Sequence, residues 1–156
     1  MTSDMGPRVL VVEDGDEYLQ NLTRFVAGPV YLQVHTGAAA LAALGEQPVD
    51  VIYLDMRFDR IDRGDLLGDV GEATRQMGGS QERAYRHLQN HQGLYILQAL
   101  REAGHGHLPV ILAYDFSHEQ ARFAHLARLH PSLTWVPDAI TPEAIRSRIL
   151  RLSGVD

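Results

Sequence analysis

Three carboxylates of this chain stand directly after the apolar runs of two predicted strands. Glu13 and Asp14 follow the run RVLVV at 8–12, and Asp55 follows the run VIYL at 51–54. In open α/β sheets the ligand crevice lies outside the carboxyl ends of the strands. Two adjacent parallel strands would therefore bring these three side chains to the place where such a sheet usually binds its ligand. We call Glu13, Asp14 and Asp55 the acidic edge.

The positions of the acids depend on how the strands are ordered. The run VIYL is rich in β-branched and aromatic residues, as is typical of a strand buried on both faces of a parallel sheet. Similar runs and helical apolar periodicity predict five strands alternating with five helices, with the strands at 8–12, 31–35, 51–54, 108–113 and 133–136. This alternation predicts an α/β fold, a doubly wound parallel sheet of flavodoxin-like order 2-1-3-4-5 with helices on both faces.

The alternation is interrupted between 58 and 92, where no strand is predicted and glycine, arginine and acidic residues dominate. Leu66, Leu67 and Val70 are expected to face inward from one short helix, and Ser80 is expected to cap a second helix. A connection this long in a compact domain is usually functional or partly disordered. Its few apolar residues require it to lean on the rest of the domain, on a second copy or on a partner.

Composition excludes several classes of function. The formal charge of −6 and the lack of a basic stretch argue against nucleic-acid binding. The chain has no cysteine, and all 14 of its basic residues are arginine, which excludes thiolate chemistry and any mechanism that needs a lysine amine. We find no signal peptide and no apolar run that could span a membrane, so we predict a cytoplasmic protein.

Four motifs in order resemble the receiver domain of response regulators, the CheY-like family of two-component (phosphorelay) signalling. They are RVLVVED at 8–14, DVIYLDM at 50–56, LPVILAYD at 108–115 and TWVPDAITPEAI at 134–145. The resemblance covers nearly the whole chain except 58–92, a segment that the family ordinarily lacks. We therefore predict a single receiver-like domain over 1–156 with an insertion at about 58–92.

The resemblance implies a role for each member of the acidic edge. Asp55 would be the phosphoacceptor, and Glu13 and Asp14 would hold Mg²⁺ together with Asp55 and the backbone carbonyl of Arg57. The chemistry agrees, because three crowded carboxylates repel one another unless a hard divalent cation neutralises them. The alternative is that these acids are simply solvated at the ends of their strands.

Two features of the family pattern are absent. Tyr114 stands where the fourth strand normally ends in threonine or serine. Asp138 stands in the place of the lysine that pairs with the phosphoryl group, or Val136 does if the alignment is shifted to use Pro137. Neither register supplies a cation, and a fourth carboxylate would disfavour phosphate. An arginine of the insertion, Arg60 or Arg63, could reach in instead.

The aromatic switch position of the family matches Trp135. In the family, a hydroxyl drawn toward the phosphate lets this aromatic side chain turn inward. With Tyr114 filling the space, we expect this relay to be blocked or permanently set. The chain therefore resembles a degenerate receiver, or pseudo-receiver.

We predict a stand-alone, non-enzymatic signalling protein that acts through protein–protein interaction, with a weakened or lost phosphorylation switch. Its partner would be a histidine kinase or a downstream signalling protein, docked on the fourth helix, fifth strand and fifth helix or on the insertion; a homodimer is also open. The candidate partner-binding arginines of the insertion are Arg60, Arg63, Arg83 and Arg86.

Two alternatives remain. The first is a working response regulator phosphorylated on Asp55 by a histidine kinase. The second is a Mg²⁺-dependent phosphohydrolase, because such enzymes also place an aspartate after an α/β strand. They typically repeat an acid two residues later, where this chain has Arg57, so we rank this reading last.

Overall fold

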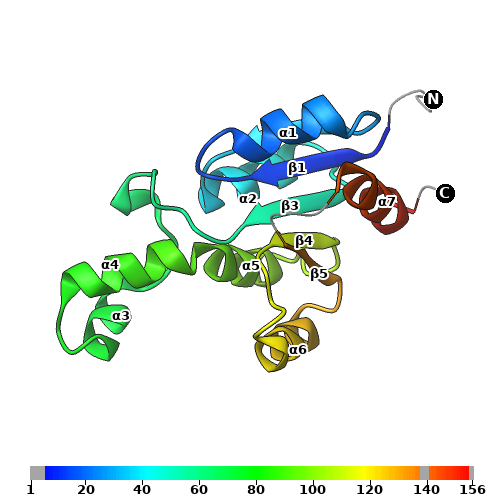
Figure 1. Ribbon diagram of the computed structural model, residues 1–156. Coiled ribbons are helices and arrows are strands. Elements are labelled where there is room, and N and C mark those ends of the chain that lie inside the picture. Colours follow the sequence, from blue (N-terminus) through cyan, green and yellow to red (C-terminus); the bar gives the residue numbers. More distant parts are fainter. Residues whose placement is uncertain (1–5, 138–140, 155–156) are drawn as a thin grey trace.

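A five-stranded parallel sheet forms the centre of the computed structural model, which describes residues 6–137 and 141–154. The strands lie in the order β2-β1-β3-β4-β5, which confirms the predicted topology (Figure 1). They are β1 (Arg8–Val12), β2 (Val30–Val34), β3 (Val51–Asp55), β4 (Val110–Ala113) and β5 (Leu133–Val136). In this order β1 and β3 are paired neighbours, with Val12 opposite Leu54.

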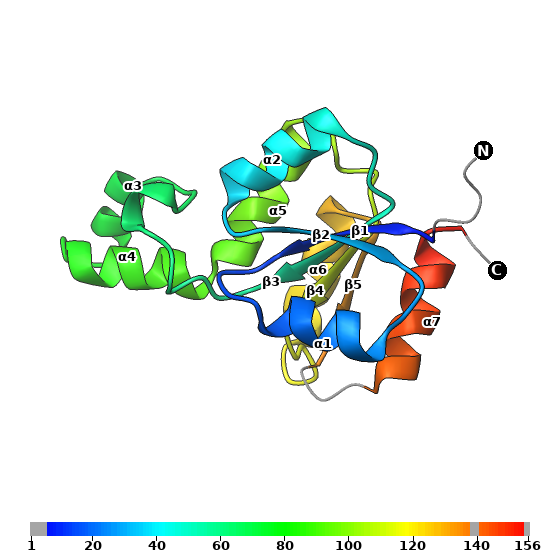
Figure 2. The same cartoon turned by 90° about the horizontal axis from the view of Figure 1, so that it is seen from above.

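Helices cover both faces of the sheet, so the fold is the predicted doubly wound α/β type. The helices are α1 (Glu17–Phe25), α2 (Gly37–Glu46), α3 (Val70–Gln76), α4 (Gln81–Asn90), α5 (Gln92–Glu102), α6 (Gln120–Leu129) and α7 (Pro142–Leu152). Helices α1 and α7 pack on one face, whereas α2, α5 and α6 pack on the other (Figure 2). Within the described residues, none of these helices is long and apolar enough to cross a membrane.

The side chains of β1 explain why its run is apolar throughout. Val9 and Val11 point into the core under α1 and α7, whereas Leu10 and Val12 point into the core under α2 and α5. All four are completely buried. A strand covered on both faces has no solvent-facing side, which is the reason that such strands lose the apolar–polar alternation.

Element boundaries follow local chemistry. Strand β4 begins at Val110 rather than at 108, because Pro109 has no N–H to donate, although its carbonyl still accepts a hydrogen bond from the Ile52 N–H at 2.9 Å. Helix α7 begins as predicted, with Pro142 in its first turn and the Thr141 hydroxyl accepting from the Ala144 N–H at 3.3 Å.

The segment 58–92 forms a 3₁₀ turn, η1 (Arg63–Asp65), followed by α3 and α4. Helix α4 is capped by Ser80 as predicted, and it continues into α5 with a break at His91. Figures 1 and 2 both show α3 and the outer part of α4 standing away from the sheet. The expected short helix over 66–70 is wrong, because Leu66 and Leu67 lie in the link between η1 and α3.

The inner part of this segment nevertheless belongs to the core of the domain. Phe58 and Leu88 are completely buried in the same cluster as residues of β3 and α5. The side-chain amide of Gln92, also fully buried, bonds both the N–H and the carbonyl of Leu67, at 2.7 and 3.0 Å. The segment therefore packs against the rest of its own domain.

Candidate functional site

The three acids of the acidic edge converge because β1 and β3 end side by side. Glu13 and Asp14 follow the last residue of β1, and Asp55 is the last residue of β3. Val12 lies opposite Leu54, so the residues that follow them lie close together. The pKa of Asp55 is raised to about 7, first by burial and then by repulsion from Asp14 and Glu13. The predicted meeting of these carboxylates is thus present, but each has a different set of contacts.

Glu13 is turned toward the start of α1. The residue is 1% exposed. One carboxylate oxygen accepts from the Tyr18 N–H at 3.0 Å, and the other accepts from the Leu19 N–H at 2.8 Å and from the Gln33 amide at 2.9 Å. Burial raises its pKa, against the opposing effect of these hydrogen bonds. Glu13 therefore performs the task of a helix cap, satisfying N–H groups that the first turn leaves open.

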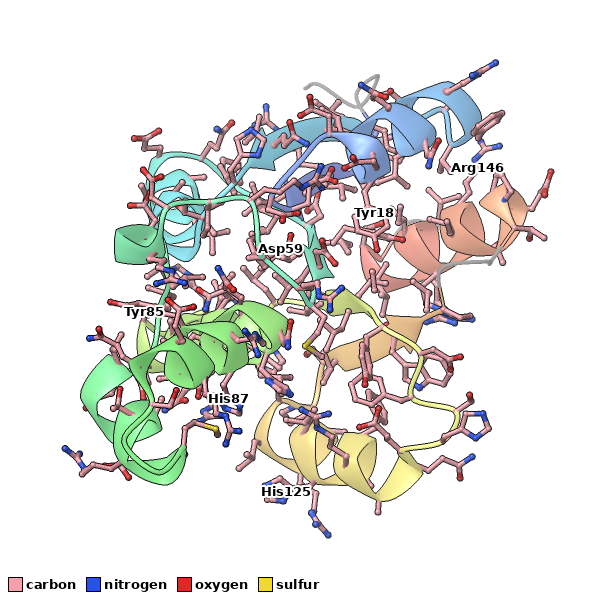
Figure 3. All side chains as sticks on the ribbon, turned by 60° about the vertical axis from the view of Figure 1, so that its left-hand side comes forward. Tyr18, Asp59, Tyr85, His87, His125 and Arg146 are labelled. Carbon is pink, nitrogen blue, oxygen red and sulfur yellow. The ribbon has the colours of Figure 1, made fainter. Side chains whose placement is uncertain are left out.

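Asp14 is held by the segment that follows β3. Its Oδ2 accepts from the Asp59 and Arg60 backbone N–H groups at 3.0 and 3.1 Å, and its Oδ1 accepts from Arg60 Nη2 at 3.1 Å. The Asp14 side chain is only 3% exposed as a result. Figure 3 labels Asp59 in this segment and Tyr18 on α1.

The Arg60 guanidinium also binds Glu17 in α1. Its Nη1 and Nη2 donate to the two carboxylate oxygens of Glu17 at 2.9 and 2.8 Å. This pairing lowers the pKa of Glu17 to about 2. Gly15 provides the room, because a Cβ atom at that position would lie 2.3 Å from Arg60 Nη2. Arg60 was one of the two arginines of the insertion expected to reach toward the acidic edge, and its guanidinium does contact Asp14.

Asp55 is the open member of the acidic edge. Its Oδ1 accepts from the Met56 N–H at 2.8 Å. The side chain lines a hollow of about 570 Å³ whose walls come from α1, the α4–α5 junction and the end of β4. They include Tyr18, Asn90, His91, Tyr114 and Asp115. A phosphoryl-sized group therefore has room beside Asp55.

The backbone around Asp55 is fixed by the start of α5. The Gly93 N–H donates to the Met56 carbonyl at 2.9 Å. A Cβ atom at Gly93 would lie 2.5 Å from the Asp55 carbonyl oxygen, so only glycine permits this approach. The side chain of Arg57 points to Asn90, whose Oδ1 accepts from Arg57 Nε at 3.2 Å. The proposed use of the Arg57 carbonyl as a metal ligand stays a prediction.

Tyr114 follows β4 as predicted, but its hydroxyl is already engaged. It donates a short hydrogen bond to Glu119, at the start of α6. The Tyr114 ring packs edge-on against Phe116 with centroids 4.7 Å apart, and Phe116 packs against Trp135 at 6.0 Å. Phe116 is fully buried, and its ring contacts both predicted switch positions. Asp138 lies outside the described residues.

The remaining candidate arginines do not contact the acidic edge. Arg63 forms an ion pair with Glu82 at 2.9 Å and lies over the Tyr85 ring, with its Cζ atom 4.6 Å from the centroid. Arg83 and Arg86 are exposed on α4. Their predicted role in partner binding remains untested.

Sequence reasoning missed four contributors to this site. Gly15 and Glu17 hold the Arg60 guanidinium, Gln33 donates a hydrogen bond to Glu13, and Phe116 contacts both Tyr114 and Trp135. A signal existed only for Gly15, because a glycine between acids marks a close approach of another group. The other three depend on contacts between distant parts of the chain.

The described residues do not fit a resident divalent cation in this arrangement. The carboxylates of Glu13 and Asp14 each accept three hydrogen bonds already. Over 6–137 and 141–154, no three histidine, aspartate or glutamate side chains are arranged to hold a metal ion. The Mg²⁺ site that the resemblance implies would need these contacts to be exchanged.

Comparison of the structure with solved structures returns receiver domains over nearly their full length. The Francisella response regulator 1452 receiver domain superposes with a TM-score of 0.63 at 18% identity, covering 96% of this chain and 98% of that one. The receiver domain of NtrX from Brucella abortus gives 0.63 at 15% identity, covering 95% and 99%. A response regulator receiver domain protein from Clostridium thermocellum gives 0.61 at 17% identity, covering 95% and 94%.

No protein-family model matches the sequence, and no curated protein matches it either. The likeness to the solved structures is one of fold. The chain has the flavodoxin-like fold of response-regulator receiver domains, as its motifs predicted.

Proposed function

We propose that this chain is a receiver-like signalling module that binds other proteins and whose phosphorylation switch is weakened or lost. The observation that carries the proposal is the state of the acidic edge. Asp14, which in a working receiver would face the cation, is instead bound by Arg60 and by two backbone N–H groups. The residues that would assist phosphoryl transfer to Asp55 are thus committed to other contacts.

The Asp55 carboxylate is also poorly prepared to attack phosphorus. Burial and the two neighbouring acids raise its pKa to about 7, which lowers the share of the ionised form at neutral pH, and the ionised form is the nucleophile. Phosphoryl transfer further needs positive charge on the transferring oxygens. The chain has no lysine to supply it, and the Tyr114 hydroxyl is held by Glu119.

Two surfaces are suited to a protein partner such as a histidine kinase or a downstream signalling protein. The first is the face of α6, β5 and α7, where a hollow of about 450 Å³ is lined by Phe123, Trp135, Pro137 and Arg148. The second is the outer face of α4, where Arg83 and Arg86 are exposed. Charged, projecting helices of this kind favour an acidic partner surface.

The alternative of a working phosphoacceptor has one observation in its favour, which is the open hollow of about 570 Å³ beside Asp55. A phosphohydrolase has none, because the second acid that its mechanism needs is replaced by Arg57, whose side chain bonds Asn90. We therefore retain only the phosphoacceptor as a second candidate.

The experiment that separates the two is intact-mass analysis after incubation with acetyl phosphate and Mg²⁺, with the Asp55→Asn variant as the control. We expect at most a trace of singly phosphorylated protein, absent in the variant. Stoichiometric, long-lived labelling that Asp55→Asn abolishes would establish the working phosphoacceptor and overturn the proposal.

The partner surface on α4 has its own test. Arg83→Glu and Arg24→Glu change the charge equally at exposed positions on α4 and on α1. With a cognate histidine kinase as the probe, we expect Arg83→Glu to weaken binding and Arg24→Glu to leave it unchanged. Equal effects of the two variants would remove α4 from the partner surface.

A further inference from the structure

We propose that Arg60 is a built-in cation that takes the place of a divalent metal ion at the acidic edge. The resemblance to receiver domains implies a metal at this edge, and the described residues do not fit one as they stand. The contacts of Arg60 explain the disagreement, because its guanidinium supplies positive charge to the same carboxylate that a metal would need.

The geometry is that of a fixed charge bridge. The guanidinium reaches Asp14 with one nitrogen at 3.1 Å and both oxygens of Glu17 at 2.8 and 2.9 Å. Bidentate pairing of this kind matches the planar fork of arginine and is stronger than a single contact. The backbone N–H of the same residue also donates to Asp14, so both the main chain and the side chain of Arg60 hold this carboxylate.

The turn between β1 and α1 is shaped to receive the guanidinium. Gly15 lies against it, and a Cβ atom at Gly15 would lie 2.3 Å from Arg60 Nη2 and 2.6 Å from both Cζ and Nη1. Any side chain at this position would require Arg60 to shift. The guanidinium of Arg60 can therefore occupy this place only because residue 15 has no side chain.

Arg60 and a divalent cation compete for Asp14. Mg²⁺ binds carboxylate oxygen at about 2.0–2.1 Å, whereas both oxygens of Asp14 already accept hydrogen bonds from Arg60 or its neighbour. The two positive charges would also repel at this range. Removing the guanidinium should free one oxygen of Asp14 beside Asp55 and create the metal site that is otherwise blocked.

Arg63 provides a matched control. It lies three residues away in the same segment, is 47% exposed against 51% for Arg60, and forms an ion pair of similar length, 2.9 Å to Glu82. Its partners are on α4 and not in the acidic edge. Loss of Arg63 therefore removes an equal charge without touching Asp14.

The test is thermal unfolding in increasing MgCl₂, with KCl used to match ionic strength, for wild type, Arg60→Gln, Arg63→Gln and Arg60→Gln/Asp14→Asn. We expect only Arg60→Gln to respond, with a rise in Tm of about 5–10 °C at a hundredfold excess of Mg²⁺ over its Kd. The double variant should lose this response, because it lacks the carboxylate that Arg60 released.

Each other outcome overturns the proposal. A wild type that is stabilised by Mg²⁺ as strongly as Arg60→Gln would show that the guanidinium does not block the site. An Arg60→Gln variant that folds but ignores Mg²⁺ would show that Arg60 is not a substitute for the metal. If the variant does not fold, calorimetric titration of wild type with MgCl₂ decides, since a submillimolar Kd contradicts the proposal and no binding supports it.

The inference does not depend on the proposed signalling role. Labelling by acetyl phosphate and binding of the kinase test that role, whereas the response to Mg²⁺ tests Arg60 alone.

Discussion

The two aspartates of the acidic edge are compensated in opposite ways. At Asp14 the carboxylate is 3% exposed and receives three hydrogen bonds, one of them from a guanidinium. At Asp55 the carboxylate accepts from the Met56 N–H and faces an open hollow, and burial raises its pKa to about 7. Fixed donors therefore balance the charge at Asp14, whereas a proton balances it at Asp55.

Because of this difference, the stability of the site depends on geometry at Asp14 and on pH at Asp55. A carboxylate matched by fixed donors depends on their positions, and its contribution to stability is lost when a donor moves. A carboxylate matched by a proton depends on the medium, and its contribution changes as the pH crosses its pKa values. Variants of the two aspartates should therefore respond to different variables.

The largest effect is expected from Asp14→Ala. This change leaves two backbone N–H groups without an acceptor and removes one of the two carboxylates that pair with the Arg60 guanidinium, so the free energy of unfolding should fall by about 2–3 kcal/mol. Urea unfolding at pH 8 measures it. Asp14→Asn keeps one acceptor oxygen, so its free energy of unfolding should fall by less. A loss below about 0.5 kcal/mol for Asp14→Ala would mean that the fixed donors do not stabilise the edge.

At pH 8, Asp55→Asn should raise the free energy of unfolding, by less than the amount that Asp14→Ala lowers it. The folded pKa of about 7 lies above the ordinary 3.8, so between these values the folded state holds a proton that the unfolded state has lost. The contribution of Asp55 to stability is therefore full below about pH 4 and is lost as the pH rises through about 7.

The upward shift of the Asp55 pKa limits the gain in the free energy of unfolding to about 4 kcal/mol. Because water reaches the hollow, we expect Asp55→Asn to gain only about 1–2 kcal/mol at pH 8. At pH 4 the variant and wild type should differ little. Urea unfolding at both pH values measures the difference. A gain that is equal at the two pH values would show that the pKa of Asp55 is not raised.

The smallest change in stability is expected from Glu17→Gln. Glu17 shares Arg60 with Asp14, but its side chain is 64% exposed. Solvent screening should keep the fall in Tm at pH 7 to no more than about 1–2 °C. Since Arg60 lowers the pKa of Glu17 to about 2, any difference should vanish as the pH falls from about 4.5 through 2. A larger fall at pH 7 would show that Glu17 contributes as much as Asp14 to holding Arg60.

The sequence was sufficient to predict the sheet and the meeting of the acids. Each strand was an apolar run, and the alternation with helices fixed the order that places β1 beside β3. The position of Tyr114 after β4 followed in the same way. These features depend on local pattern and on the few topologies that parallel sheets allow.

What each acid contacts could not be predicted. The choice between Arg60 and Arg63 depends on the path of the backbone after β3, which the Asp59 and Arg60 N–H groups set by bonding Asp14. Similarly, Leu66 and Leu67 were correctly expected to face inward, but their helix was wrong because the Gln92 amide holds Leu67 in a link. Contacts between distant residues decided both cases.

The bridge between Arg60 and Asp14 also has a consequence for the order of events in folding. It joins residues 46 positions apart, and closing so long a loop for one contact is entropically costly. We expect pairing of β1 with β3 to bring the two ends together first, so that the bridge forms after the rate-limiting step rather than before it. An interaction absent from the transition state slows unfolding without speeding folding. We therefore expect the bridge to lengthen the lifetime of the folded chain, which the unfolding rate of Arg60→Gln against wild type measures.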